Sequence, residues 1–286
     1  MNSKALFKDL IHQIAFPESK EEIREQVFML IQHFMGYSKT EILSGKEIPQ
    51  NPDLLESLKH SIKRLNAGEP VQYITGHQFF YGRAFSVTSD VLIPRPETEG
   101  LIDEICSFFH SRLESPTLLD LGTGSGCLSV TLALEIPGAK IKATDISEKA
   151  LEVARQNALK WNANIDFFLH DMLQQDLPQG TYDGVVSNPP YVSMAEKSSL
   201  QKQVIQFEPH QALFVPDDDP LIFYKALVKK VFPSLKDGGI LCVEIHENFG
   251  KEIAARFQQE GYSSVKILQD TQGKDRIVRG EKSNKG

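Results

Sequence analysis

Glycines, carboxylates and an amide follow consecutive strand-forming segments in the second half of the chain. The run DLGTGSG (Asp120–Gly126) follows one such segment, Asp145 ends the next in KIKATDI, Asp171 follows IDFFLH, and Asn188 follows YDGVVS. Ligand crevices of parallel sheets open where the strands end, so we expect these residues to line one crevice. A carboxylate at the end of the second strand can accept both hydroxyls of a ribose, and the pattern therefore predicts a ligand that contains a nucleoside.

The glycine-rich run lets the backbone approach a ligand closely, and a helix N-terminus follows it. A dinucleotide site prefers G-x-G-x-x-G, whereas this run reads D-x-G-x-G-x-G and has Cys127 at the sixth position of that fingerprint. The spacing resembles the class I methyltransferase fold, whose cofactor is S-adenosylmethionine. The resemblance implies these cofactor-binding residues: Asp120, Gly122, Thr123, Gly124, Ser125, Gly126, Asp145, Asn188 and, beside the adenine, Asp171 and Met172. The alternatives are a structural turn, a helix-capping Asp145 and an ordinary loop acid at Asp171.

The segment SNPPY (Ser187–Tyr191) ends a strand with a rigid, polar and aromatic tip. A planar nitrogen that receives a methyl group carries N–H donors, and these need fixed acceptors when water is excluded. Asn188 Oδ1 and a backbone carbonyl of the Asn-Pro region can supply such acceptors, and the prolines hold them in place. The segment predicts methylation of a planar nitrogen by four substrate-binding residues: Asn188, Pro189, Pro190 and Tyr191. A proline-stiffened structural turn is the alternative.

Four motifs occur in an order that resembles the HemK-type family of release factor glutamine N5-methyltransferases: PRPETE, DLGTGSG, SNPPYVS and FEPHQAL. The resemblance extends from Gly68 to Gly280. It implies transfer of a methyl group from S-adenosylmethionine to the side-chain amide of the glutamine in the Gly-Gly-Gln motif of class I release factors. It also implies that the N-terminal region docks the release factor at a distance from the chemistry, and that S-adenosylhomocysteine is the product.

Two of these motifs are expected to build the walls of the site, through Arg95, Glu97 and Glu208, either as structure or by direct contact. The sequence departs from the family pattern in two loops. FVPDDDPL (residues 214–221) replaces a glycine-rich GGxDG, and EIHENFG (residues 244–250) replaces EIG. Both departures bear on loop geometry, and we expect His246 at the surface rather than acting as a base.

The residues before about 70 predict a small helical domain. KEEIREQVFMLIQHFMG (Lys20–Gly36) places its apolar residues on one helical face. SKTE (Ser38–Glu41) has the spacing of a capping box, and Asn51-Pro52 has the pattern of a helix N-terminus. The segment holds no catalytic constellation, so its role is expected to be recognition or packing.

The spacing of the apolar residues changes after this domain. VQYITGHQFFYGRAFSV, which begins at Val71, is aromatic and β-branched and predicts a β-hairpin, followed by the stiff PRPE linker. From Thr117 strands and helices alternate, which predicts a doubly wound, mostly parallel α/β sheet. We therefore expect a helical recognition domain over 1–70, a hairpin and linker over 71–98, and the S-adenosylmethionine-dependent methyltransferase domain over 99–286.

The composition favours a cytoplasmic protein, and we expect the enzyme to act as a monomer. The net charge is −7 and no long basic run occurs, which lowers the expectation of direct nucleic-acid binding. The three cysteines lie far apart, so neither a metal site nor a disulfide framework is indicated, and no apolar run is long enough for a membrane span. A nucleic-acid amino methyltransferase would share the Asn-Pro-Pro-Tyr tetrad but should show a basic groove. A non-enzymatic cofactor-binding scaffold would leave the tetrad unexplained.

Overall fold

The structure is a computed structural model that describes residues 2–16, 19–110, 112 and 115–283. The chain forms two compact units. The first comprises Met1–His77 together with Gln201–Phe207, and the second comprises Gln78–Leu200 together with Glu208–Gly286.

The first unit is helical, and its helix ends follow from local sequence. Ser38 and Glu41 exchange both hydrogen bonds of the capping box, Asn51 Oδ1 accepts from the first turn of its helix, and Gly36 ends its helix in the left-handed region. These expected features are confirmed. The apolar faces meet in one core that includes Val27, Leu30 and Leu58. The helices are α1 (Ser3–Gln13), α2 (Lys20–Met35), α3 (Lys39–Ser44), α4 (Pro52–Asn66), α5 (Val71–Thr75) and α9 (Lys202–Phe207).

The structure differs from the expected organisation in two places. Val71–Thr75 is a helix rather than the start of the hairpin, because Val71 and Ile74 share one helical face and pack into the helical core. Gly76 then ends this helix with φ of 74°. In addition, α9 clusters with the first unit, whereas residues 99–286 were expected to form one uninterrupted methyltransferase domain.

 The expected methyltransferase domain over 99–286 is therefore interrupted at Gln201–Phe207, which belongs to the helical unit.

The expected hairpin forms, but over a shorter range than predicted. It consists of β1 (His77–Phe80) and β2 (Arg83–Ser86), joined by Tyr81-Gly82. Both turn residues have positive φ, 48° and 73°, as a tight two-residue turn between twisted strands requires. The buried Phe80 and Phe85 anchor this hairpin in the core of the second unit.

The second unit is built on a sheet with the strand order β10-β11-β9-β6-β3-β4-β5. The strands β6, β3, β4 and β5 and the pair β6–β9 run parallel, whereas β11 is antiparallel to both β9 and β10. The chain leaves β3 toward β4 and β5 and then returns to β6 on the other side, which creates a switch point at β3. The strands are β3 (Thr117–Leu121), β4 (Lys140–Asp145), β5 (Ile165–Leu169), β6 (Tyr182–Ser187), β9 (Leu235–Glu244), β10 (Tyr262–Gln269) and β11 (Asp275–Lys282).

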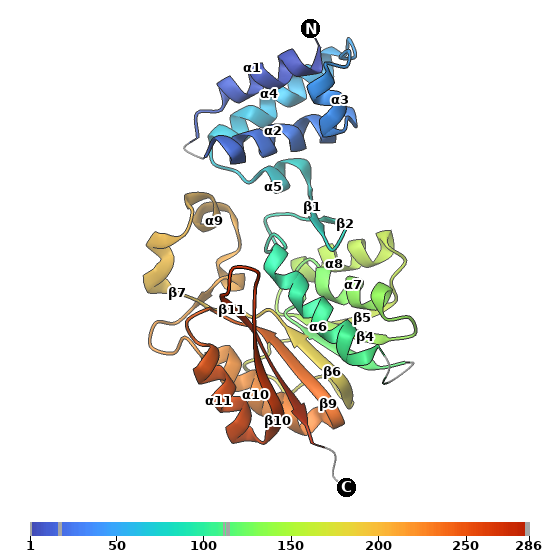
Figure 1. Ribbon diagram of the computed structural model, residues 1–286, viewed down its shortest axis with the longest axis vertical. Helices are drawn as coiled ribbons and strands as arrows, with labels where there is room; N and C mark the ends of the chain where they lie inside the picture. The colour runs from blue at the N-terminus through green and yellow to red at the C-terminus, as the bar shows by residue number, and fades with distance from the viewer. Residues whose placement is uncertain (1, 17–18, 111, 113–114, 284–286) are drawn as a thin grey trace. The chain divides into compact units, whose positions relative to one another are not determined.

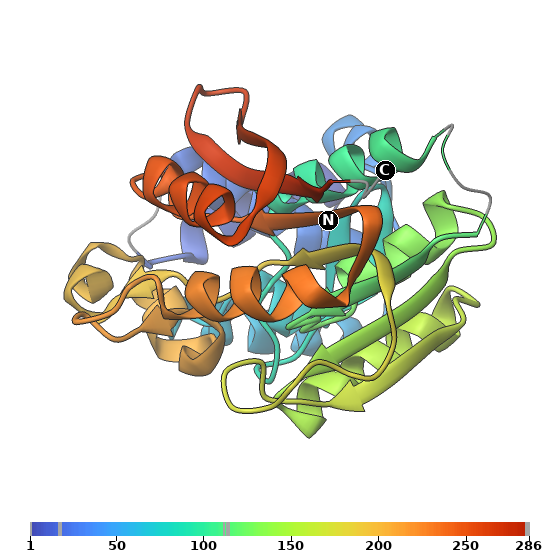
Figure 2. The ribbon, with the colours of Figure 1, turned by 90° about the horizontal axis from the view of Figure 1, so that it is seen from below.

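Helices cover both faces of this sheet, as the alternating pattern predicted. One core joins α6, α7 and α8 to one face of the sheet, and a second core joins α10 and α11 to the opposite face. Figures 1 and 2 show the green helices on one side and the orange and red helices on the other. The helices are α6 (Glu99–Phe109), α7 (Cys127–Glu135), α8 (Glu148–Lys160), α10 (Ile222–Ser234) and α11 (Gly250–Glu260).

Short elements complete the second unit around the ends of the parallel strands. The PRPETE segment forms η1 (Pro96–Thr98) at the entrance to α6, and FEPHQAL contains η3 (His210–Ala212). After the Asn-Pro-Pro-Tyr segment, β7 (Val192–Ser193) pairs in parallel with β8 (Phe214–Val215) and leads into η2 (Met194–Ser199). Across the described residues, every helix falls short of the length and apolar character that a membrane crossing requires.

Candidate active site

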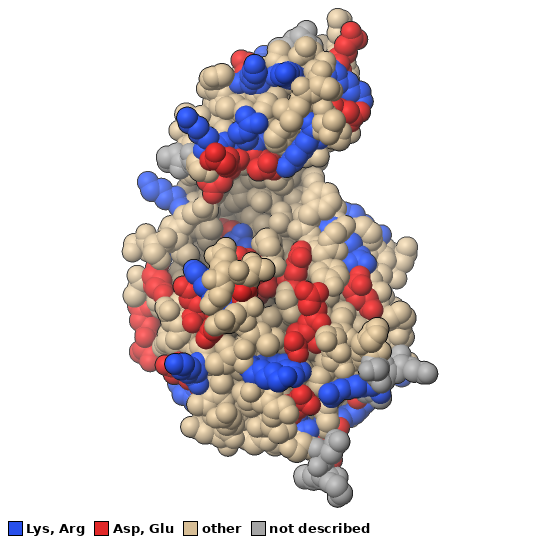
Figure 3. Space-filling model, in the orientation of Figure 1, with Lys and Arg blue, Asp and Glu red and all other residues tan. Residues whose placement is uncertain are grey.

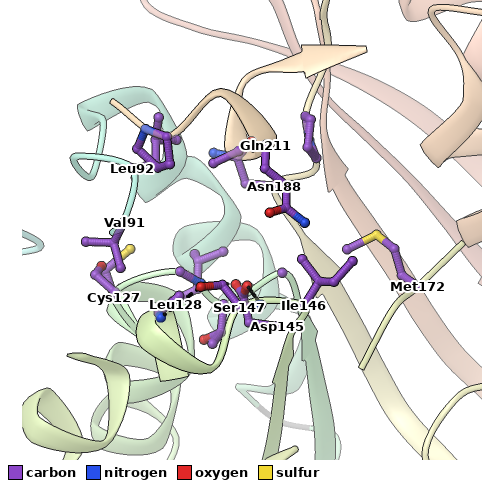
Figure 4. Close-up of a pocket in the computed structure, with 18 of the residues that line it drawn as sticks. Val91, Leu92, Cys127, Leu128, Asp145, Ile146, Ser147, Met172, Asn188 and Gln211 are labelled. Atoms are coloured by element: carbon purple, nitrogen blue, oxygen red, sulfur yellow. Dashed lines mark hydrogen bonds between the residues drawn. The ribbon is translucent and has the colours of Figure 1, made fainter. Parts of the chain in front are cut away.

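A cavity of about 280 Å³ lies in the second unit at the carboxyl ends of β3, β4 and β6. Its wall contains most of the residues expected to bind cofactor or substrate: Arg95, Gly122, Thr123, Gly124, Ser125, Asp145, Asp171, Met172, Asn188 and Pro190. In Figure 4 the side chain of Asn188 reaches into this cavity, with Asp145 across from it and Met172 at one flank. Parallel strands brought these distant residues together, as the positions of the motifs predicted.

The glycine-rich turn and Asp145 are held together by the backbone. Gly124 N donates to Asp145 Oδ2 and Ser147 N donates to Asp145 Oδ1, each at 2.9 Å. Gly124 has φ of 55°, and a Cβ at this position would meet no atom within 4 Å. A side chain there would both strain the backbone and enter the open cavity, so glycine keeps this space available for a ligand.

Two carboxyl groups near the turn differ in their surroundings. Burial raises the pKa of Asp145, although both of its oxygens accept backbone hydrogen bonds and its side chain lines the cavity. Asp120 is fully buried, and burial raises its pKa to about 7. Its Oδ2 accepts from Thr123 Oγ1 at 2.7 Å, and it lies outside the described residues that line the cavity. Asp145 is therefore placed for direct ligand contact, and Asp120 is placed to support the turn.

A lysine that the sequence did not single out fastens the loop after β5. Lys230 Nζ, from α10, donates to the carbonyl oxygens of Met172, Leu173 and Gln175 at 3.0, 2.9 and 2.6 Å. The Asp171 carboxylate accepts from Leu173 N within the same loop. The loop thus has a defined shape, and Met172 presents its side chain to the cavity.

A buried asparagine, also not anticipated, supports the glycine-rich turn from behind. Asn157 Nδ2 donates to the carbonyl oxygens of Ser125 and Ser86, and Asn157 Oδ1 accepts from Ser86 N at 2.7 Å. Asn157 is the polar member of an otherwise apolar buried face of α8. A lone asparagine among the apolar positions of a helical segment is the sequence signal that could have revealed it.

Asn188 takes part in a chain of hydrogen-bonded side chains whose inner members, Thr98 and Glu244, are buried. Its Nδ2 donates to Thr98 Oγ1 at 3.1 Å, and Thr98 Oγ1 donates to Glu244 Oε2 at 2.6 Å. The hydroxyl of Tyr191 donates to Glu244 Oε1 at 3.1 Å. Thr98 and Glu244 lie within the quoted PRPETE and EIHENFG segments, but neither was assigned a role from the sequence. The Asn-Pro-Pro-Tyr tip is therefore attached to two other motifs.

The remaining residues of the tetrad differ in their relation to the cavity. Pro189 and Tyr191 lie outside the described residues that line it, whereas Pro190 lines it. The ring of Tyr191 packs edge-on against His246, which contacts Glu196 at 3.2 Å. His246 is partly buried rather than at the surface as expected, because it packs in this aromatic contact.

The expected site wall divides into different roles. Glu208 is buried and accepts from Arg95 at 2.5 Å and from Ile93 N at 3.2 Å. Arg95 lines the cavity, whereas Glu208 supports it from behind. Glu97 is exposed and lies outside the described lining residues. Gly126, at the N-terminus of α7, also lies outside this set, and a Cβ there would approach Ala154 to 3.1 Å.

Comparison with known proteins identifies two parts of the chain. Residues 98–212 match the Methyltransferase small domain family, and residues 14–76 match the PrmC N-terminal domain family. The release factor glutamine methyltransferase of Bacteroides thetaiotaomicron is 40% identical over 90% of this chain and 92% of its own length. The enzyme of the same name from Staphylococcus aureus is 33% identical over 97% of this chain and 98% of its own length.

The chain belongs to the release factor glutamine methyltransferase family. A methyltransferase from Pyrococcus furiosus has a similar fold, with a TM-score of 0.50 and 19% identity over 82% of this chain and 100% of that chain. The class I methyltransferase fold expected from the sequence is confirmed.

The cavity of this methyltransferase fits S-adenosylmethionine. The carboxylate of Asp145 could accept from the hydroxyls of a ribose, the open space at Gly124 could admit a ligand along the turn, and Met172 could offer an apolar surface to a base. Each of these groups belongs to a different strand end, so together they suit an extended nucleoside cofactor.

Proposed function

We propose that this methyltransferase transfers a methyl group from S-adenosylmethionine to the side-chain amide nitrogen, N5, of the glutamine in the Gly-Gly-Gln motif of class I peptide-chain release factors. The observation that carries this proposal is the Asn188 amide, which lines the same cavity as Asp145 and donates its own N–H to Thr98. Its Oδ1 is thereby left to accept a hydrogen from a target amide. The names of the relatives support the choice of substrate.

Asp145, Gly124 and Met172 would hold the cofactor. Asp145 already accepts one backbone N–H on each oxygen and keeps further lone pairs for hydroxyl donors. When bound, S-adenosylmethionine supplies an electrophilic methyl group. The loop that carries Met172 is fixed by Lys230, so the apolar side of this site is formed before a ligand arrives.

The Asn-Pro-Pro-Tyr tip would hold the target amide. Asn188 Oδ1 and a backbone carbonyl of the Asn-Pro segment would each accept one hydrogen of the amide, which orients its nitrogen and stabilises positive charge that develops there. Because the proton can leave after transfer, no general base is required before it. The prolines fix φ and remove N–H donors that would compete with the target amide.

The partner would be selected by the helical unit. One amide in a cavity cannot distinguish one glutamine from another, so a second contact is needed, and residues 1–70 are proposed to dock the release factor. We propose that the enzyme acts as a cytoplasmic monomer without direct contact to nucleic acid. On the face in Figure 3 the described Lys and Arg side chains are interspersed with Asp and Glu, which supports a protein partner over a polyanion.

The test is to incubate the protein with isotopically labelled S-adenosylmethionine and either a release factor or unmethylated DNA, and to locate the label by mass spectrometry. We expect label on the glutamine of the Gly-Gly-Gln motif only. A release factor in which this glutamine is replaced by Asn is the matched control and should remain unlabelled. Label on DNA, or on other residues of the release factor, would overturn the proposal.

A further inference from the structure

The hydrogen-bond chain Asn188–Thr98–Glu244–Tyr191 has a direction, which follows from the chemistry of its members. An ionised carboxylate can only accept hydrogen bonds, so Thr98 must donate its single hydroxyl hydrogen to Glu244 Oε2, 2.6 Å away. The Thr98 oxygen can then only accept from Asn188, at 3.1 Å. Asn188 must therefore direct its Nδ2 toward Thr98 and leave Oδ1 for the cavity.

Glu244 is held on both oxygens, which keeps it in the acceptor role. Oε2 accepts from Thr98 and Oε1 accepts from Tyr191 at 3.1 Å, and Glu244 as a whole residue is 2% exposed. If Glu244 gained a proton, it could donate to Thr98, and Thr98 could donate to Asn188 Oδ1. The amide would then turn by 180° about its Cβ–Cγ bond and direct its Nδ2 into the cavity, where a donor would oppose the hydrogens of a target amide.

We propose that Thr98 and Glu244 are positioning residues for methyl transfer. Their hydrogen bonds hold the Asn188 amide so that its oxygen faces the substrate. The negative charge of Glu244 sets the direction of these hydrogen bonds. The proposal rests on the function proposed above and assigns roles to two residues outside the Asn-Pro-Pro-Tyr tetrad. Thr98 lines the cavity and Glu244 lies outside its described lining residues, and both are assigned a role that acts through Asn188.

The surroundings of Glu244 place its change of charge in an accessible pH range. Burial is the largest cause that raises its pKa to about 7; the charge of Glu97 adds to this effect, and Arg276 opposes it. Tyr191 and Tyr224 also face Glu244, and burial raises the pKa of both hydroxyls, so they remain neutral near pH 7. Turnover should therefore fall as the pH drops below about 7, because protonated Glu244 no longer enforces the direction of the chain.

The kinetic test compares Thr98→Val, which keeps the shape of the side chain but removes the hydroxyl, with Thr98→Ser, which keeps the hydroxyl. At saturating cofactor we expect Thr98→Val to lower kcat about tenfold, less than the loss of the acceptor itself, and Thr98→Ser to remain within about twofold of wild type. Thr131→Val is the matched control, since Thr131 is buried on α7 and its hydroxyl has no partner among the described residues. Equal kcat for Thr98→Val and Thr131→Val would overturn the proposal.

The pH test uses Glu244→Gln, because Gln is close in shape but does not ionise. Its amide offers one donor and one acceptor and permits either direction of the chain. We expect kcat of wild type to rise through about pH 7 and kcat of Glu244→Gln to lack this rise and to lie below wild type at pH 8. A rise that persists in Glu244→Gln would belong to another group, such as the buried Asp120, and would contradict the role of Glu244.

A third readout needs no release factor. The side-chain amide resonances of Asn188 in the full chain, assigned by their loss in Asn188→Asp, report its hydrogen bond directly. We expect them to shift with pH near 7 in wild type but not in Glu244→Gln, and to move in Thr98→Val. Unchanged resonances in both variants would overturn this inference even if the release factor is methylated. The expected shifts without methylation of a release factor would instead refute only the proposed function.

Discussion

Replacement of Asn188 by Ala removes two interactions at once, and its effect on turnover tests the site most directly. The variant loses the proposed acceptor for the target amide. It also loses the hydrogen bond from Asn188 Nδ2 to Thr98 Oγ1, which is 3.1 Å long in the wild-type protein. Loss of one preorganised group at a reacting centre costs about 10²–10³ in kcat, or about 2.7–4 kcal/mol. We expect kcat of Asn188→Ala to fall by this amount. Cofactor affinity should change much less, because Asp145 and the glycine-rich turn keep their contacts.

Asn188→Asp separates the acceptor from the donor. It keeps an oxygen for the target amide but places a second oxygen opposite Thr98, whose hydrogen is already donated to Glu244. The added negative charge also holds the cationic cofactor more tightly before the transition state and so spends binding energy in the ground state. We therefore expect this variant to be impaired, but less than Asn188→Ala.

The assay measures initial rates of methyl transfer to a release factor at saturating cofactor, with calorimetry of cofactor binding to confirm that each variant is folded. Activity of Asn188→Ala within about tenfold of wild type would correspond to at most about half of the expected loss in free energy. The Asn-Pro-Pro-Tyr segment would then be a structural turn, and the mechanism derived from it would be wrong.

Three further predictions address the rest of the molecule. Asp145→Ala should weaken cofactor binding by about one to two decades, since charge-assisted hydrogen bonds contribute about 1.5–3 kcal/mol, and unchanged affinity by calorimetry would remove Asp145 from the site. Lys230→Met should weaken cofactor binding about tenfold, because the loop that carries Met172 loses its hydrogen bonds to Nζ while the apolar part of the side chain is kept. Lys230→Arg is the control. Equal cofactor affinity of Lys230→Met and wild type would contradict this role. A chain that begins at Gln78 should still bind cofactor but methylate the complete release factor much more slowly; equal rates of shortened and full-length enzyme would refute the docking role of the helical unit.

Much of the fold could be predicted because its signals are short-range. The capping box of Ser38 and Glu41 and the N-terminal Asn51 act on N–H groups within one helical turn. Where local signals conflicted, prediction failed. The β-branched and aromatic residues after Val71 favour a strand, yet the burial of Val71 and Ile74 in the helical core selects a helix.

The candidate site was predicted to the extent that it depends on strand ends. Asp145 and Asn188 each follow a parallel strand, and parallel strands end at the same edge of a sheet, so their shared cavity follows from the order of the motifs. The sequence gives no comparable rule for Glu208. Its position behind Arg95 depends on a loop that returns to the second unit after α9.

The amino-acid sequence by itself determined the fold class, the family and the residues at the strand ends, because each depends on local patterns or on a general rule of chain topology. Only the tertiary structure decided which side chains support them. Thr98 lies 90 residues from Asn188 and 146 residues from Glu244, and Lys230 lies 58 residues from Met172. A buried hydrogen bond forms where packing removes both groups from water, so that each is the other's partner. Which two groups are paired in this way depends on the whole folded chain and not on any single segment of it.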